Sequence, residues 1–214
     1  VNLHSIIIDN AGTGKSSIAQ ILSRVFYDHG ITSKEDAVMV DAIDYSKFSR
    51  DFEKNFERAK GGILFIDNVN KLVPAGYASE LNPLDRVFAA MDRSGYDPIV
   101  ILSGLPKGLK EYLAENANVK ARFKYIFELP DLSPEDLYKI AKNHLKKNNF
   151  VLSQEAAGKL RKLFEHLVRV KDESFGNARV AIRQAEETIN NYFLRVSNGA
   201  PDNNVILSED IIAE

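Results

Sequence analysis

The segment Gly12-Thr-Gly-Lys-Ser16 constrains the fold of this chain more than any other feature of its sequence. It follows an apolar run at residues 5–9, and apolar residues at helical spacing, including Ile18 and Leu22, come after it. A glycine-rich turn between a strand and a helix lets backbone N–H groups converge on phosphate oxygens at the positive end of the helix. The sequence therefore predicts a phosphate-binding loop, and the alternative is an ordinary glycine-rich turn with a solvated Lys15.

The motif assigns a task to each residue of this loop. Lys15 is expected to reach the β- and γ-phosphates, and the Ser16 hydroxyl is expected to coordinate Mg²⁺. The usual pattern, G-x-x-x-x-G-K-[ST], has a glycine where this chain has Asp9. The residues predicted to contact nucleotide are Asn10, Ala11, Gly12, Thr13, Gly14, Lys15, Ser16 and Ser17.

A second apolar run, Gly61-Gly-Ile-Leu-Phe-Ile-Asp67, ends in a carboxylate. In a parallel sheet that is buried on both faces, such a strand places Asp67 at the carboxyl edge, beside the phosphate loop. Asp67 is therefore predicted to hold Mg²⁺ through water. Many buried strands end in Asp at a turn, so the prediction depends on the pairing with the loop.

Short β-branched runs alternate with helical patterns up to Pro130, which is typical of an α/β fold with a parallel sheet. After Pro130 the strand-like runs stop, and Ser133, Ser153 and Asn177 are placed to cap helices. We therefore predict an α/β nucleotide-binding subdomain at residues 1–130 and a helical lid subdomain at residues 131–214. The predicted strands are residues 5–9, 37–41, 62–67, 99–103 and 125–129.

Composition narrows the function classes. The 214 residues are 44% hydrophobic and 27% charged, with a net charge of −2 and no cysteine. No basic excess supports nucleic-acid binding, and no apolar run approaches the roughly 20 residues that span a bilayer. Disulfides and thiolate metal sites are excluded. We expect a cytoplasmic protein that binds neither nucleic acid nor membrane.

Several segments together resemble the AAA+ ATPases of the CbbX (red-type Rubisco activase) and stage V sporulation protein K family. The resemblance covers nearly the whole chain and implies a five-stranded phosphate-loop fold, binding of ATP and Mg²⁺, and assembly into a hexameric ring or a tandem arrangement. The segments are "NAGTGKSSIAQIL", "AKGGILFIDN", "PIVILSG", "NANVKARF", "LPDLSPEDL", "FGNARVAIRQAEE" and "VILSEDI".

The resemblance also implies roles for three further residues. Ser103 occupies the polar sensor position that helps to place the attacking water, although an ordinary serine at a strand end is an equal alternative. Arg122 matches the arginine finger that reaches the nucleotide of the next subunit, and the alternative is a surface arginine that precedes a strand. Arg179 matches the second sensor, which is carried by the lid and binds the γ-phosphate of the nucleotide; the alternative is a solvated arginine in the first turn of a helix. Arg183 lies four residues further on the same helix face.

The chain departs from the family at identifiable positions. Asp9 replaces a glycine, Ala11 replaces a proline, and Asn68 replaces the catalytic Glu. The aromatic pore loop is shortened, which leaves Tyr45 and Phe48 as candidates to grip a substrate or as core residues of a helix ending at Ala59. The segment that normally precedes the first strand is absent, so we expect the chain to be an excised fragment.

Three functions are compatible with this pattern. The first is an ATP–Mg²⁺-binding module whose own hydrolysis is slow, because the Asn68 amide cannot accept a proton. The second is an active ATPase that remodels a protein client, with another residue in place of the missing Glu. The third is a nucleotide-free scaffold for interactions. The expected catalytic residues are Lys15, Asp67, Asn68, Ser103, Arg122 and Arg179.

Overall fold

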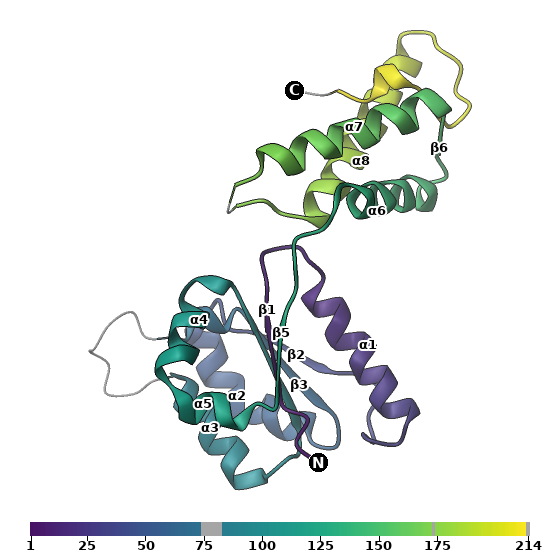
Figure 1. Ribbon diagram of the computed structural model, residues 1–214. Helices are drawn as coiled ribbons and strands as arrows, with labels where there is room; N and C mark the ends of the chain where they lie inside the picture. Colours follow the sequence, from purple (N-terminus) through teal and green to yellow (C-terminus); the bar gives the residue numbers. More distant parts are fainter. Residues whose placement is uncertain (74–82, 173, 213–214) are drawn as a thin grey trace. The chain divides into compact units, whose positions relative to one another are not determined.

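The computed structural model describes residues 1–73, 83–172 and 174–212, which form two compact units (Figure 1). One unit consists of Val1–Asn10 with Gly14–Pro130. The other consists of Ala11–Thr13 with the described residues of Asp131–Glu214. Residues 1–130 and 131–214 remain our proposal for the functional domains.

The first unit contains a five-stranded parallel sheet in the order β2-β3-β4-β1-β5. Each strand differs from its predicted range by one residue at one end, and the predicted parallel α/β class is confirmed. Apolar, β-branched runs produce these strands because both faces of the sheet are covered. The strands are β1 (Ser5–Ile8), β2 (Val38–Asp41), β3 (Ile63–Asp67), β4 (Ile99–Gly104) and β5 (Tyr125–Glu128).

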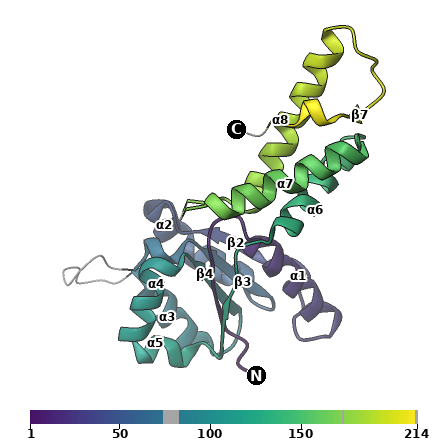
Figure 2. The ribbon, with the colours of Figure 1, turned by 45° about the horizontal axis from the view of Figure 1, so that its top comes forward.

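Helices cover both faces of this sheet (Figures 1 and 2). Alternate strand residues point to opposite faces, so Ile7 packs with α1 whereas Ile6 and Ile8 pack with the helices of the other face. The first face is covered by α1 (Lys15–Asp28). The second is covered by α2 (Tyr45–Ala59), α3 (Pro83–Ser94), α4 (Pro106–Glu115) and α5 (Ala117–Arg122).

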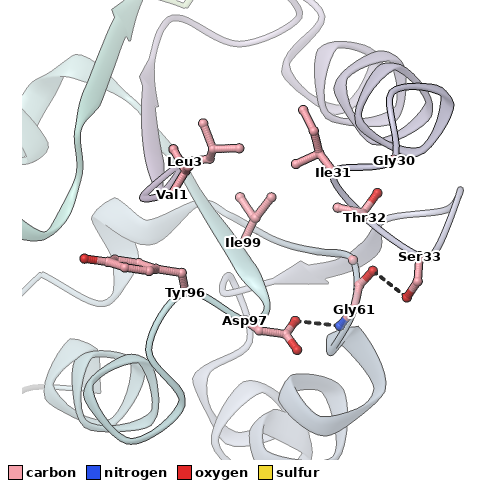
Figure 3. Close-up of a pocket in the computed structure, with 11 residues that line it drawn as sticks. Val1, Leu3, Gly30, Ile31, Thr32, Ser33, Gly61, Tyr96, Asp97 and Ile99 are labelled. Carbon is pink, nitrogen blue, oxygen red and sulfur yellow. Dashed lines mark hydrogen bonds between the residues drawn. The ribbon is translucent and has the colours of Figure 1, made fainter.

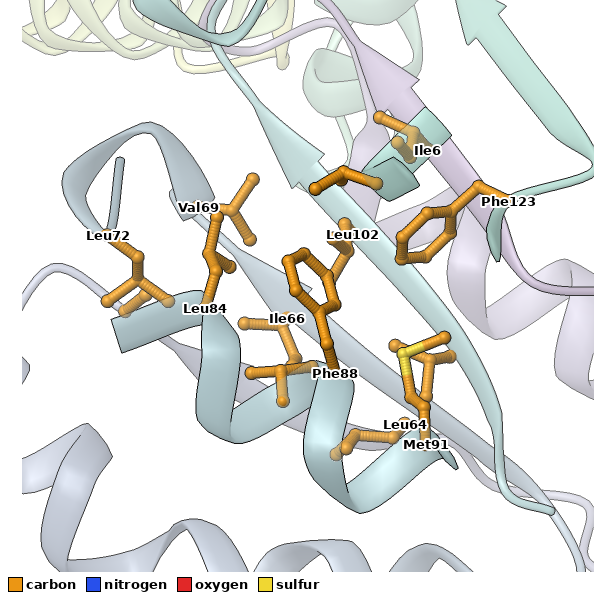
Figure 4. Packing of buried hydrophobic residues seen from close by; sticks show 14 of the residues in the cluster. Ile6, Leu64, Ile66, Val69, Leu72, Leu84, Phe88, Met91, Leu102 and Phe123 are labelled. Carbon is orange, nitrogen blue, oxygen red and sulfur yellow. The ribbon is translucent and has the colours of Figure 1, made fainter. Parts of the chain in front are cut away.

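The larger core lies between the sheet and helices α2 to α5, and Figure 4 shows its packing around α3. Phe88 and Met91 of α3 meet strand residues such as Leu64 and Leu102, all of them buried. Each fully buried side chain of this size contributes about 1.5–3 kcal/mol. This packing holds β3 and β4 side by side and so fixes the positions of the residues at their carboxyl ends.

The second unit is built mainly from α6 (Pro134–Lys147), α7 (Gln154–Val170) and α8 (Ala178–Ser197). The expectation that no strands follow Pro130 was wrong, because β6 (Val151–Leu152) pairs in parallel with β7 (Val205–Ile206). Two residues are too few to show a strand period in the sequence. The short 3-10 helix η2 (Ser208–Asp210) follows β7. Among the helices of the described ranges, none has the length and apolar character needed to cross a bilayer.

Two of the three predicted helix caps are confirmed. Ser133 accepts a hydrogen bond from the N–H of Asp136, and Ser153 accepts one from Ala156. The third prediction was wrong, because the Asn177 side chain caps no N–H group of α8. Its buried amide instead accepts a bond from the N–H of Leu132 (2.9 Å) and donates to Asp131 Oδ1 (3.0 Å).

The structure shows the surroundings of three residues for which the sequence predicted a functional role. Phe48 is buried in α2, so it is a core residue and not a residue that grips substrate. Tyr45 is half exposed, and its role stays a prediction. Arg122 precedes β5 and is the last residue of the short helix α5, which the sequence patterns did not reveal.

Buried His4 gives the first unit a testable pH dependence. The N–H of Val100 donates to His4 Nδ1 (2.9 Å), so this nitrogen carries no proton. Burial lowers the pKa of His4 and outweighs the opposing effect of the Gly95 carbonyl. The unfolded chain, with a His pKa of about 6.5, therefore binds more protons, and the free energy of unfolding should fall as the pH drops below that value.

Urea unfolding at pH 7 and pH 5 tests this. His4→Asn keeps an acceptor near the Val100 N–H and cannot be protonated, so it should lose part of the pH dependence. The exposed His29 is the matched control, and His29→Asn should keep the full dependence. Equal pH dependence in the His4 variant and the unchanged protein would contradict the argument.

Candidate functional site

The phosphate loop lies between β1 and α1, where the sequence places it. Gly14 precedes the first residue of α1 and has a left-handed conformation, with φ 104°. No side chain caps the N-terminus of α1, and its first turn contains no acidic residue. Ser16 and Ser17 are exposed in this turn. A helix N-terminus of this kind is a suitable site for a phosphate group.

Asp9 changes the electrostatics of this loop. It is 1% exposed, and its carboxylate forms an ion pair with the Lys15 ammonium. Lys15 Nζ also donates a hydrogen bond to the Asn10 carbonyl (3.0 Å). Asp9 therefore does not lie at a remote edge of the loop, because it holds the cation that is expected to bind phosphate. An incoming phosphate must compete with this carboxylate for Lys15.

Three predicted residues meet at the carboxyl edge of the sheet. The Ser103 hydroxyl donates to Asp67 Oδ1 (2.9 Å), and the Asn68 N–H donates to the same oxygen (2.8 Å). Ser103 is fully buried at the end of β4, whereas Asp67 and Asn68 are half-buried. The adjacent parallel strands β3 and β4 bring these groups together.

The sequence analysis missed Asp41. Asn68 has a left-handed backbone (φ 59°), and its Nδ2 donates to Asp41 Oδ1 (2.8 Å). Asp41 ends β2 directly opposite Asp67 in the strand register. Asp41 could have been found from the sequence, because it is the last residue of a predicted strand and so lies at the same sheet edge as Asp67.

Arg122 lies apart from the phosphate loop in its own unit. It precedes β5, and its carbonyl accepts a bond from the side chain of Asn2, so it belongs to the amino-terminal edge of the sheet. Asp92 binds its guanidinium through two hydrogen bonds (2.8 and 3.2 Å), and Phe88 stacks beneath it. The Arg122 hydrogen bond holds the pKa of Asp92 below its usual range. The structure therefore does not bring Arg122 to Lys15 of the same chain.

Arg179 belongs to the second unit, where it is exposed in the first turn of α8. It lines a pocket of about 550 Å³ together with Arg183 and Lys171. Ala11 lies in the same unit and lines the same pocket. Gly12 has φ 77°, and a Cβ there would meet the Gly176 carbonyl oxygen at 2.0 Å, so only glycine fits. The sensor role of Arg179 stays a prediction.

Another pocket lies at the opposite edge of the sheet (Figure 3). Its lining includes Leu3 and Ile99, at the amino-terminal ends of the strands. Its carboxylate, Asp97, accepts a hydrogen bond from the Gly61 N–H (2.5 Å). The phosphate loop and Asp67 do not line this pocket, so we do not assign it to the candidate site.

The sheet order, the loop and the carboxylate-ended strand define an α/β protein with the phosphate-loop fold. A model of the AAA lid domain matches residues 133–214. Stage V sporulation protein K of Bacillus subtilis is 28% identical over 92% of this chain and 63% of its own length. CbbX of Cereibacter sphaeroides is 29% identical over 86% of this chain and 60% of its own length. RuvB of Thermotoga maritima, a Holliday junction branch migration motor, matches 97% of this chain with a TM-score of 0.65 at 15% identity, which shows the fold alone.

The chain is thus similar over most of its length to stage V sporulation protein K and CbbX, and its C-terminal part matches the AAA lid domain, as expected of a divergent relative of these AAA+ proteins. It spans less than two thirds of the length of these two relatives. ESX-3 secretion system protein EccA3 of Mycolicibacterium smegmatis is 27% identical over 78% of this chain, which spans 28% of that protein.

The Asp9–Lys15 ion pair generates a prediction about affinity. Asp9→Gly should strengthen ATP binding about 10- to 100-fold. A like charge 4 Å from a phosphate costs up to about 4 kcal/mol at an effective dielectric near 20, and each 1.4 kcal/mol is tenfold. Titration with a fluorescent ATP analogue measures the effect. Asp9→Asn, which removes only the charge, should show most of the gain, and Asp9→Glu should show little. Unchanged affinity in both Asp9→Gly and Asp9→Asn would disprove the competition.

Proposed function

We propose that this chain is a nucleotide-binding AAA+ module that binds ATP with Mg²⁺ and hydrolyses it slowly. The observation that carries this proposal is the uncapped, acid-free N-terminus of α1 at the same sheet edge as the Asp67–Ser103 pair. Lys15 and the backbone of the loop would bind the phosphates. Ser16 and Asp67 would hold the metal ion, since hydroxyl and carboxylate oxygens suit Mg²⁺.

Slow hydrolysis follows from the side chain at position 68. An amide orients water through hydrogen bonds but accepts no proton, and a general base contributes typically 10²–10⁴-fold. The NH₂ group of the Asn68 amide also donates a hydrogen bond to Asp41, so this group is already engaged. Asp9 lowers affinity and Asn68 lowers turnover, and the two effects are separable in experiment.

Assembly and partners are proposed from the family. AAA+ relatives commonly form rings, and we propose a hexamer or a tandem arrangement in a cytoplasmic protein with a chaperone-like protein client, without nucleic acid or membrane. Arg122 supports this proposal because it lies away from the loop of its own chain, where it would be available to a neighbouring copy. Its guanidinium is partly exposed beside Asp92.

A second candidate function is a scaffold that binds no nucleotide. The Asp9–Lys15 ion pair favours it, because Lys15 already has an anionic partner inside the protein. The scaffold and the nucleotide-binding module differ in a single measurable property, which is the binding of ATP.

Calorimetric titration with ATP and Mg²⁺ tests the proposal. The unchanged protein should bind, Lys15→Ala should weaken binding at least tenfold, and removal of Mg²⁺ should weaken it further. Turnover should stay well below the ordinary range of about 1–10³ s⁻¹. Absence of binding at millimolar ATP would support the scaffold and refute the proposal, whereas turnover in the ordinary range would refute slow hydrolysis.

Mixing two inactive variants tests the proposed role of Arg122 in a neighbouring copy. Arg122→Ala keeps the phosphate loop, and Lys15→Ala keeps Arg122. If the arginine acts across an interface, the mixture should regain hydrolysis that neither variant shows alone. The exposed Arg93 provides the control, and Arg93→Ala should keep its own activity. A mixture as inactive as its components would count against a shared site.

A further inference from the structure

The hydrogen bond between Asn68 and Asp41 brings a carboxylate to position 68, and the proposed function gives Asp41 no role of its own. Asp41 Oδ1 accepts it at 2.8 Å and also accepts the N–H of Ile43 at 2.9 Å. Both hydrogen bonds go to the same oxygen. For Oδ2, the structure shows no hydrogen bond within its described ranges. The Asp41 side chain is exposed, so water reaches it.

This contact also fixes which way the Asn68 amide points. A carboxylate accepts hydrogen bonds and does not donate them, so the NH₂ group of Asn68 must face Asp41. The carbonyl oxygen of Asn68 is then left to accept a hydrogen from water. The left-handed backbone of Asn68 and its bond to Asp67 Oδ1 hold this arrangement in place. An amide and a carboxylate are thus held together at the sheet edge beside Asp67.

We infer that Asp41 supplies the general-base carboxylate that position 68 lacks. The inference rests on the proposed ATP binding and names the group behind the remaining hydrolysis. Asp41 takes a proton from the attacking water, directly or through one bridging water, while Asn68 orients that water. A bond forms between the water oxygen and the terminal phosphorus as the bond from that phosphorus to the bridging oxygen breaks. The electron pair leaves on ADP.

The competing explanation is purely structural, because Asp41 also holds the turn between β2 and α2 through the Ile43 N–H. A structural role would make Asp41→Asn less stable and would weaken the binding of all nucleotides alike. A general base acts only where the water attacks, so its loss spares the binding of ATP and weakens the binding of a transition-state analogue.

Two readouts on Asp41→Asn separate these explanations. The first is single-turnover hydrolysis of radiolabelled ATP, followed over hours because the reaction is slow. The second is the ratio of the affinities for ATP and for ADP with aluminium fluoride, which imitates the phosphoryl group in transfer. Asp36→Asn is the matched control, because Asp36 is exposed two residues before β2 and makes no hydrogen bond or ion pair with the described residues.

We expect Asp41→Asn to bind ATP like the unchanged protein, to hydrolyse it about 10²- to 10⁴-fold more slowly, and to bind the analogue correspondingly less well. Asp36→Asn should match the unchanged protein in all three respects. The double change Asp41→Asn with Asn68→Glu should restore turnover, since it moves the carboxylate across the same hydrogen bond without placing two carboxylates side by side.

Several outcomes would overturn the inference. They are unaltered hydrolysis in Asp41→Asn, equal weakening for ATP and the analogue, and no detectable hydrolysis in the unchanged protein. The first two outcomes leave the proposed function intact, and the third leaves its ATP binding intact but removes its slow hydrolysis. If the unchanged protein does not bind ATP at all, the proposed function fails, and the inference fails with it.

Discussion

Burial of both faces of the parallel sheet is the constraint on which the rest of the first unit depends. Along each strand, alternate residues pack against α1 on one face of the sheet and against α2 to α5 on the other face. Because all five strands run in parallel, their carboxyl ends meet at one edge. Asp9, Asp41, Asp67 and Ser103 come from separate parts of the chain, yet each lies at or just beyond the end of a strand at this edge. The site is therefore a consequence of strand direction.

The two Ile-Asp-Asn tripeptides of the chain show how neighbours decide what a carboxylate does. Asp9 is buried against the Lys15 ammonium, and a buried ion pair of this kind is costly to break from one side only. Asp67 receives a serine hydroxyl and a backbone N–H instead, and these neutral donors leave its negative charge uncompensated, as the proposed metal site requires. The same three residues thus have different partners in the two places, because different segments of the chain lie beside them.

The fold was largely predictable because strands buried on both faces and amphipathic helices leave strong periodic patterns. The loop, Asp67 and Ser103 could be placed because strand ends fix their positions. The Asp9–Lys15 and Asn68–Asp41 contacts depend on side-chain orientation and on backbone dihedrals, such as the left-handed φ of Asn68, which no spacing encodes. The β6–β7 pair was too short to be detected, and the Asn177 side chain was drawn into contacts 45 and 46 residues away in the sequence rather than into a cap.

The balance of charges at the carboxyl edge of the sheet determines how strongly a nucleotide could bind there. Asp9, Asp41 and Asp67 surround a site whose predicted phosphate-binding cation is Lys15, and Asp9 already pairs with that lysine. ATP would add several negative charges to this edge, and each unscreened pair of like charges at 4 Å is unfavourable by about 4 kcal/mol at an effective dielectric near 20. Binding therefore requires positive charge from outside this set of residues. In the proposed complex, Mg²⁺ held by Asp67 would supply two such charges, and the proposed arginine of another copy would supply a third. It follows that nucleotide affinity in this chain should depend on metal concentration and on assembly more steeply than in a loop with glycine at position 9.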